Sequence, residues 1–136
     1  MGPIARRLTD WTMVAGMAAT TAGCFLFAAG AGAAGAIHFT DRGVESQIGQ
    51  PISSVYDASQ QAFKDMGITV KRTINEQEGG VTKRTLEGST SDRDVEVVMK
   101  TDGSGTHVDV VAKKTAVTWD KDYARAIMDK IVALAK

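Results

Sequence analysis

Cysteine is nearly absent from this sequence, and neither sign of charge is in excess. The single cysteine, Cys24, lies in an apolar N-terminal stretch, so the rest of the chain has no disulfide and no thiolate ligand for zinc or an iron–sulfur cluster. The formal net charge of the 136 residues is zero. Because no basic field is available to attract phosphates, we expect no nucleic-acid partner.

The sequence also lacks a recognisable catalytic set. Its only two histidines, His38 and His107, are far apart along the chain, and we interpret each as a surface or interfacial residue. Four acidic residues lack the spacing of a calcium loop and are predicted to be turn or helix-start residues: Asp92, Asp94, Asp120 and Asp122. We therefore expect no enzymatic activity, no metal site and no cofactor.

The most conspicuous feature that is present is an uncharged apolar run from Trp11 to Ile37. As a helix it would reach roughly 40 Å, enough to cross a hydrocarbon core of about 30 Å. Arg6 and Arg7 precede the run, which favours a cytoplasmic N-terminus. The predicted organisation is a cytoplasmic segment 1–10, a transmembrane or signal-anchor helix 11–37 and a periplasmic domain 38–136, at the bacterial cell membrane.

A lipoprotein signal is the alternative interpretation of the same residues. Thr21-Ala22-Gly23-Cys24 looks like a lipobox, in which small residues before the cysteine suit cleavage and acylation of its sulfur. Leucine is usual where Thr21 stands, and a polar residue is common after the cysteine, where Phe25 stands here. The sequence is compatible both with a retained transmembrane helix and with a lipid anchor at Cys24. In either case the domain would be exported across the membrane.

Small residues recur at the end of the apolar run. Residues 30–35 match the G-x-G-x-x-G dinucleotide pattern, but they lack the strand–helix context that this pattern needs, so we reject a nucleotide site. Four small residues are candidates for close helix packing within the membrane: Ala28, Gly32, Gly35 and Ala36. They predict other membrane-protein subunits as partners, unless they simply fill a low-complexity anchor.

The remainder of the chain predicts one α+β domain. A short strand within 39–48 is followed by an amphipathic helix that starts at Pro51 and ends before Gly67. Four strands then form a meander through the segments 68–74, 81–87, 95–99 and 108–113, with a bulge expected near Lys113-Lys114. A closing helix is capped by Asp120, and its predicted buried stripe is Tyr123, Ile127, Ile131 and Leu134.

These elements predict a two-layer sandwich, in which an antiparallel sheet of four to five strands carries two helices on one face. The other face is expected to be solvated or to hold a partner, and it bears Lys71, Thr73, Glu96, Lys100, Asp109 and Lys113. Trp119 and Tyr123 are candidate partner contacts, although packing within the domain would explain them equally well.

The sequence resembles a family of small bacterial envelope lipoproteins defined by a domain of unknown function. The resemblance is carried by Gly23-Cys24, by the Ala/Gly run, and by a helix that ends at Met66-Gly67 and leads into the strand Ile68-Thr69-Val70. It implies export and membrane anchoring, with Cys24 as the lipid-attachment site. It implies no catalytic residue.

Two functions are compatible with these features. The first is a non-catalytic accessory or structural subunit of a larger membrane complex, for example an electron-transfer or photosynthetic one. The second is a free-standing envelope lipoprotein that binds a small molecule, a lipid or a cell-wall component.

Overall fold

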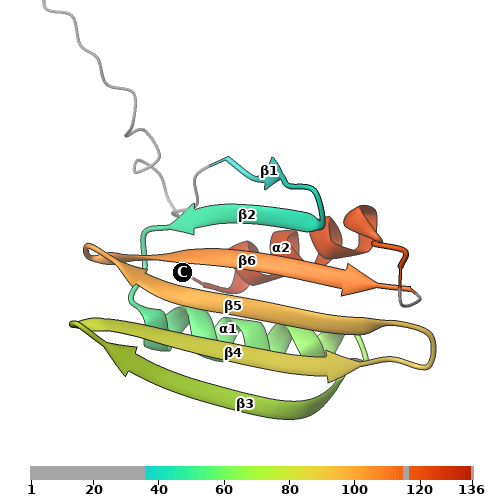
Figure 1. Ribbon diagram of the computed structural model, residues 1–136, viewed down its shortest axis with the longest axis horizontal. Coiled ribbons are helices and arrows are strands. Elements are labelled where there is room, and N and C mark those ends of the chain that lie inside the picture. Colours follow the sequence, from blue (N-terminus) through green and yellow to red (C-terminus); the bar gives the residue numbers. More distant parts are fainter. Residues whose placement is uncertain (1–35, 115–116, 136) are drawn as a thin grey trace, which may run out of the picture.

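The computed structural model describes residues 36–114 and 117–135 (Figure 1). Its elements, in chain order, are β1 (His38–Phe39), β2 (Gly43–Ile48), α1 (Ile52–Asp65), β3 (Thr69–Glu78), β4 (Val81–Ser89), β5 (Asp94–Asp102), β6 (Gly105–Lys113) and α2 (Lys121–Leu134). Within these residues, no helix is both long enough and apolar enough to traverse a lipid bilayer. Almost all of the predicted anchor 11–37 lies outside the described residues.

All six strands form one antiparallel sheet in the order β1-β2-β6-β5-β4-β3. The predicted meander of four strands is confirmed as β3 to β6, but the predicted total of four to five strands is too low. The expected strand within 39–48 is divided by a tight turn, in which the Thr40 hydroxyl accepts from the backbone N–H groups of Arg42 and Gly43 at 3.3 and 3.0 Å. β1 and β2 are therefore separate strands.

Both helices cover the same face of the sheet (Figure 1). The core between the two layers is formed by apolar side chains that alternate along the strands, as the sequence predicts. Val97 and Val108 from the sheet meet Phe63 from α1 and Ile127 from α2, and all four are fully buried. Each such side chain contributes roughly 1.5–3 kcal/mol of transfer free energy to folding. No helix of the described part of the chain covers the opposite, helix-free face of the sheet.

The predicted limits of α1 are correct to within one residue. Pro51 is the N-cap rather than the first helical residue, with φ −66° and ψ 156°. This φ is the one that the proline ring imposes, and proline has no N–H to leave unpaired at the start of a helix. After the last turn, Gly67 adopts φ 71°, the left-handed conformation that a glycine at a helix end readily provides.

The buried stripe of α2 differs from the prediction in its last member. Leu134 was expected to be buried, but 39% of it is exposed. Ala135 takes the buried position instead, because it continues the four-residue spacing from Ile127 and Ile131, and its N–H donates to the Ile131 carbonyl at 2.8 Å. The predicted N-cap is confirmed, since an Asp120 carboxylate oxygen accepts from the Tyr123 N–H.

The folded domain begins earlier than predicted. Neither Ala36 nor Ile37 is helical; Ile37 packs against the core, and the Ala36 carbonyl accepts from the Ser46 hydroxyl of β2 at 3.2 Å. The prediction that the membrane helix extends to Ile37, with Ala36 in helix packing, is therefore wrong for these two residues. The Ala36 backbone and the Ile37 side chain both contact the folded domain. The other predicted anchor residues, Cys24, Ala28, Gly32 and Gly35, lie outside the described residues.

Candidate functional site

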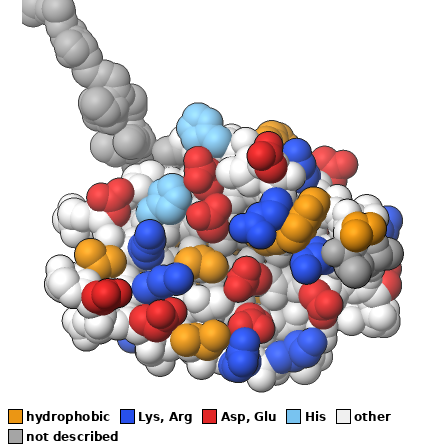
Figure 2. Space-filling model, in the orientation of Figure 1, with side chains coloured by type: hydrophobic (Ala, Val, Ile, Leu, Met, Phe, Trp, Pro, Cys, Tyr) orange, Lys and Arg blue, Asp and Glu red, His pale blue; other side chains and the backbone are white. Residues whose placement is uncertain are grey.

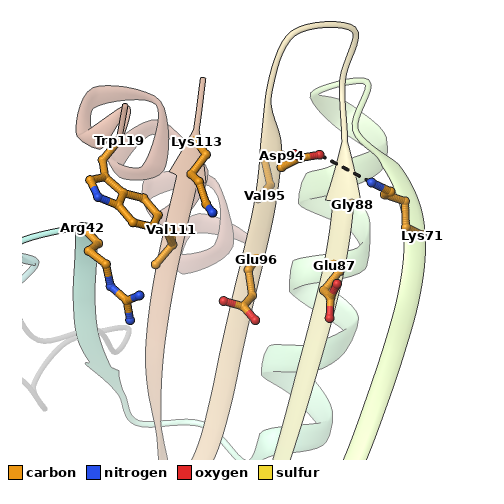
Figure 3. Close-up of a pocket in the computed structure, with 10 residues that line it drawn as sticks. All are labelled: Arg42, Lys71, Glu87, Gly88, Asp94, Val95, Glu96, Val111, Lys113 and Trp119. Carbon is orange, nitrogen blue, oxygen red and sulfur yellow. Dashed lines mark hydrogen bonds and ion pairs between the residues drawn. The ribbon is translucent and has the colours of Figure 1, made fainter. Parts of the chain in front are cut away.

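The helix-free face of the sheet contains a hollow of about 340 Å³ (Figure 3). Over this face, acidic and basic side chains are intermixed (Figure 2). The hollow is lined by Arg42, Lys71, Glu87, Gly88, Asp94, Val95, Glu96, Val111, Lys113 and Trp119. Its lining therefore combines three cationic and three acidic side chains around one aromatic ring.

Trp119 reaches this face because the chain reverses direction after β6. The N–H of Lys114 donates to the Thr118 carbonyl at 2.8 Å, and Trp119 forms an antiparallel bridge with Lys113. The predicted bulge near Lys113-Lys114 is wrong. The apolar residues Val117 and Trp119 depart from the alternation of β6 because they follow the reversal and do not continue that strand.

Two cations lie against the indole ring of Trp119. The guanidinium carbon of Arg42 is 5.3 Å from the ring centroid, and the Lys113 Nζ is 5.0 Å from it. Both distances are in the range of attractive cation–π contacts, each worth about 0.5–1 kcal/mol where the groups are partly solvated. Arg42 precedes β2 and Lys113 ends β6, so the contacts join two strands to the segment that follows the reversal. The half-buried indole is thus held at one side of the hollow (Figure 3).

Acidic side chains and their partners form the other side. Lys71 Nζ lies 3.5 Å from Asp94 Oδ1. Glu87 and Glu96 are cross-strand partners in β4 and β5, an arrangement of like charges that costs energy when it is not compensated. Arg72 compensates for Glu87, since its Nη2 donates to Glu87 Oε2 at 2.8 Å, and this hydrogen bond raises the pKa of Arg72.

The side chains of the hollow suit non-covalent binding. Three carboxylates, two ammonium groups and a guanidinium group lie around an aromatic edge, and such a set suits a partner that carries both signs of charge.

Tyr123, the second predicted contact, is not among the residues that line the hollow. Its half-buried ring packs against the core, and the Arg93 guanidinium lies 4.7 Å from the ring centroid. Burial raises the pKa of Tyr123. Arg93 in turn donates from Nε to Asp120 Oδ2 at 2.8 Å, while Asp120 Oδ1 caps α2 through the Tyr123 N–H at 3.0 Å. These contacts give Tyr123 a role in fixing the start of α2.

The Asp120 contacts predict a pH-dependent contribution to stability. The hydrogen bonds from the Tyr123 N–H and from Arg93 hold the pKa of Asp120 below its ordinary value of 3.8. Because the folded-state pKa is the lower one, the charge stabilises the fold above about pH 4 and loses this effect as the pH falls through the folded-state pKa. We expect Asp120→Ala to lower the free energy of unfolding by about 1 kcal/mol at pH 7.

Urea unfolding at several pH values measures this effect. Asp120→Asn is the matched control, because the amide oxygen still caps the helix but carries no charge. The difference between wild type and Asp120→Asn should be present at pH 7 and should disappear in acid. A difference that is constant across this pH range would contradict the assigned role of the charge.

A second polar cluster lies on the same face, at the pairing of β2 with β6. Glu45 and Asp109 are cross-strand partners, and His107 precedes Asp109 by two residues in β6. The His107 Nε2 is 3.5 Å from Glu45 Oε1 and 3.7 Å from Asp109 Oδ2. Burial raises the pKa of Asp109, against the opposing effect of His107. Donor atoms of the three half-buried residues all lie within 4.8 Å of one another, close enough to share a cation.

One protein-family model matches residues 8–133, nearly the entire chain; its description is a protein of unknown function, DUF3568. The chain belongs to the DUF3568 family. The predicted resemblance to a family defined by a domain of unknown function is confirmed at this level. No curated protein matches the sequence. The matched range of the DUF3568 model includes the whole apolar run 11–37 and nearly all of the folded domain.

The structure brings only some of the predicted residues of this DUF3568 protein together. Trp119 lines the hollow with the predicted outer-face residues Lys71, Glu96 and Lys113. The sequence did not predict that Arg42 lines the hollow. Arg42 lies in the turn between β1 and β2, and turn residues do not follow the alternating pattern that indicates a face of the sheet. His107 was predicted to be an isolated surface residue. The alternation of His107 and Asp109 in one strand was an available signal that the two share a face.

Proposed function

We propose that this DUF3568 protein is a non-catalytic accessory subunit of a larger membrane protein complex, for example an electron-transfer or photosynthetic one. In this proposal, the apolar run before residue 36 attaches the chain to the bacterial cell membrane, and the domain from Ala36 onward lies in the periplasm. The uncharged run and the preceding Arg6 and Arg7 support this orientation.

The helix-free face of the sheet is the proposed docking surface, and its occupant is another protein subunit of the same membrane. The observation that carries this proposal is the half-buried Trp119 between Arg42 and Lys113, beside the hollow. Tryptophan and arginine are the residue types that most often dominate the energy of protein interfaces. The mixture of acidic and basic side chains in the hollow matches a protein surface better than it matches a polyanion.

Replacing Trp119 tests the proposal. After gentle detergent extraction, we expect wild type to be recovered with a stoichiometric partner subunit. Trp119→Ala should weaken this association by at least 2 kcal/mol, or about 30-fold, because truncation of a central aromatic residue removes its packing and leaves its cationic neighbours without the ring. The measurement is the yield of partner per chain as a function of dilution.

Leu134→Ala is the matched control for this experiment. Leu134 is an apolar residue at the end of α2, in the helix layer; it is 39% exposed and does not line the hollow. Its variant should retain the partner as wild type does. Recovery of wild type only as a monomer, or equal retention by Trp119→Ala and wild type, would contradict the docking proposal.

The size of the hollow favours a second candidate, a free-standing envelope lipoprotein that binds a polar cell-wall component. About 340 Å³ is within the range of small-molecule sites, and the charged lining would bind a polar ligand. The intact mass of the native protein separates the two candidates. A diacylated chain that starts at Cys24 would support the lipoprotein, whereas an uncleaved N-terminus would exclude it.

A further inference from the structure

Both histidines of the chain lie beside the same carboxylate pair. His38 in β1 is the cross-strand partner of Glu45 in β2, and Glu45 is in turn the partner of Asp109 in β6. Residues that are directly opposite each other in a sheet project from the same face. His38, Glu45 and Asp109 therefore form a row across three neighbouring strands, and His107 lies beside this row. Figure 2 shows the two histidines near each other on this face, with acidic side chains around them.

The carboxylates of this row face several basic groups, since Lys100 and Arg42 as well as His107 act to lower the pKa of Asp109. Two carboxylates placed directly opposite each other repel, and the sheet register fixes Glu45 and Asp109 in that position. The imidazole of His107 has a ring nitrogen on the same side that can act as a metal ligand. A divalent cation would neutralise both carboxylates and accept the lone pair of that nitrogen.

We propose that Glu45, His107 and Asp109 bind a divalent transition metal of the zinc class, with His38 as the fourth ligand. Mg²⁺ and Ca²⁺ prefer all-oxygen sites with higher coordination numbers, whereas imidazole together with carboxylates suits Zn²⁺.

The observed distances fit this assignment. Ligand bonds of about 2.0–2.2 Å arranged as a tetrahedron place donor atoms about 3.2–3.6 Å apart. The His107 nitrogen already lies 3.5 and 3.7 Å from the two carboxylate oxygens, so side-chain rotations alone would complete the three-ligand set. His38 is exposed and is the partner of Glu45 across the strand pair, so its ring projects from the same face, beside the three-residue cluster.

The site would connect the short strand β1 to the body of the sheet. β1 has only two residues and pairs with β2 alone. A metal bound by His38 and by residues of β2 and β6 would add a second attachment that does not depend on these backbone hydrogen bonds. The proposed metal is thus structural, and none of its four ligands lines the hollow beside Trp119.

Equilibrium dialysis and titration calorimetry with ZnCl₂ test the proposal on the full-length chain in detergent, purified without a histidine tag. We expect one Zn²⁺ per chain, with no comparable uptake of Mg²⁺ or Ca²⁺. His107→Gln should weaken Zn²⁺ binding at least 100-fold, and Asp109→Asn and Glu45→Gln at least 10-fold each. The ring proton NMR signals of both histidines should shift on zinc addition.

Two controls separate this site from other sources of zinc binding. Glu96→Gln removes a carboxylate from the same face, in β5, and should bind Zn²⁺ as wild type does. Cys24→Ser removes the only thiol and should also leave the stoichiometry unchanged.

Circular dichroism of each variant tests whether it is folded. The absence of Zn²⁺ binding by wild type, or equal binding by wild type and His107→Gln, would overturn the proposal. His38→Ala should weaken binding about 10-fold. An unchanged affinity in this variant, or an unshifted His38 signal, would overturn the assignment of the fourth ligand.

Discussion

Replacing Gly43 by alanine is expected to disrupt the pairing of β2 with β6 and to lower the free energy of unfolding by about 3 kcal/mol or more. A Cβ atom at this position would overlap the carbonyl oxygen of Val110 and would lie 3.0 Å from the Val111 Cα. These are backbone atoms of the central part of the sheet, so they cannot move aside as a flexible side chain would. Overpacking of this kind costs about 1–3 kcal/mol, and more where the surroundings are rigid. Urea unfolding of the purified variant measures the loss.

Gly103→Asn is the control for Gly43→Ala. Gly103 lies in the β5–β6 turn with φ 65°, and no atom lies within 4 Å of a Cβ built on it. Asparagine tolerates this conformation better than other non-glycine residues, so we expect a change of less than about 1 kcal/mol. A Gly43→Ala variant that is as stable as this control would show that β2 and β6 are not as close as described.

Phe63→Ala is expected to lower the free energy of unfolding by about 3–5 kcal/mol. Phe63 is fully buried on α1, and its ring packs onto Gly88 of β4, where an added Cβ would come within 2.8 Å of the ring. Truncation would therefore leave a cavity between the helix and the sheet that no neighbouring side chain fills. Since domains of this size are stable by about 5–15 kcal/mol, the variant should unfold at a much lower temperature. Thermal unfolding followed by circular dichroism measures this shift.

Exposed apolar residues provide the comparison for Phe63. Val81→Ala removes two methyl groups from a side chain that is 42% exposed, and it should change the stability by less than about 0.5 kcal/mol. If the two variants lost similar amounts of stability, the core would not be organised around Phe63 as the structure indicates.

Periodicity predicted most of the fold because local patterns report which face of an element is buried. The alternation of Val95, Val97 and Met99 identified a strand with one buried face, and the three- and four-residue steps around Phe63 identified α1. The same patterns failed where a local signal had two explanations. The change of phase before Trp119 suited a bulge as well as a reversal. The turn that separates β1 from β2 is closed by hydrogen bonds between Thr40 and Gly43, which no alternation of apolar residues marks.

The candidate sites were harder to predict because they depend on which strands are neighbours. His38 and Asp109 are far apart in the sequence, and they share one row only because β2 lies between β1 and β6. An alternating pattern gives the face of each residue but not the order of strands or their register. Arg42 likewise reaches Trp119 only through the tertiary arrangement of the turn before β2.

Under the proposed anchoring, the hydrogen bond between Ala36 and Ser46 limits the distance between the domain and the bilayer, because it makes residue 36 part of the domain. If the membrane-embedded segment ends directly before residue 36, the β1–β2 edge of the sheet lies next to the lipid headgroups. With strands about 4.8 Å apart, the five spacings from β1 to β3 place the far edge no more than about 24 Å further out. A partner would then need only a short protrusion above the membrane surface to reach the indole.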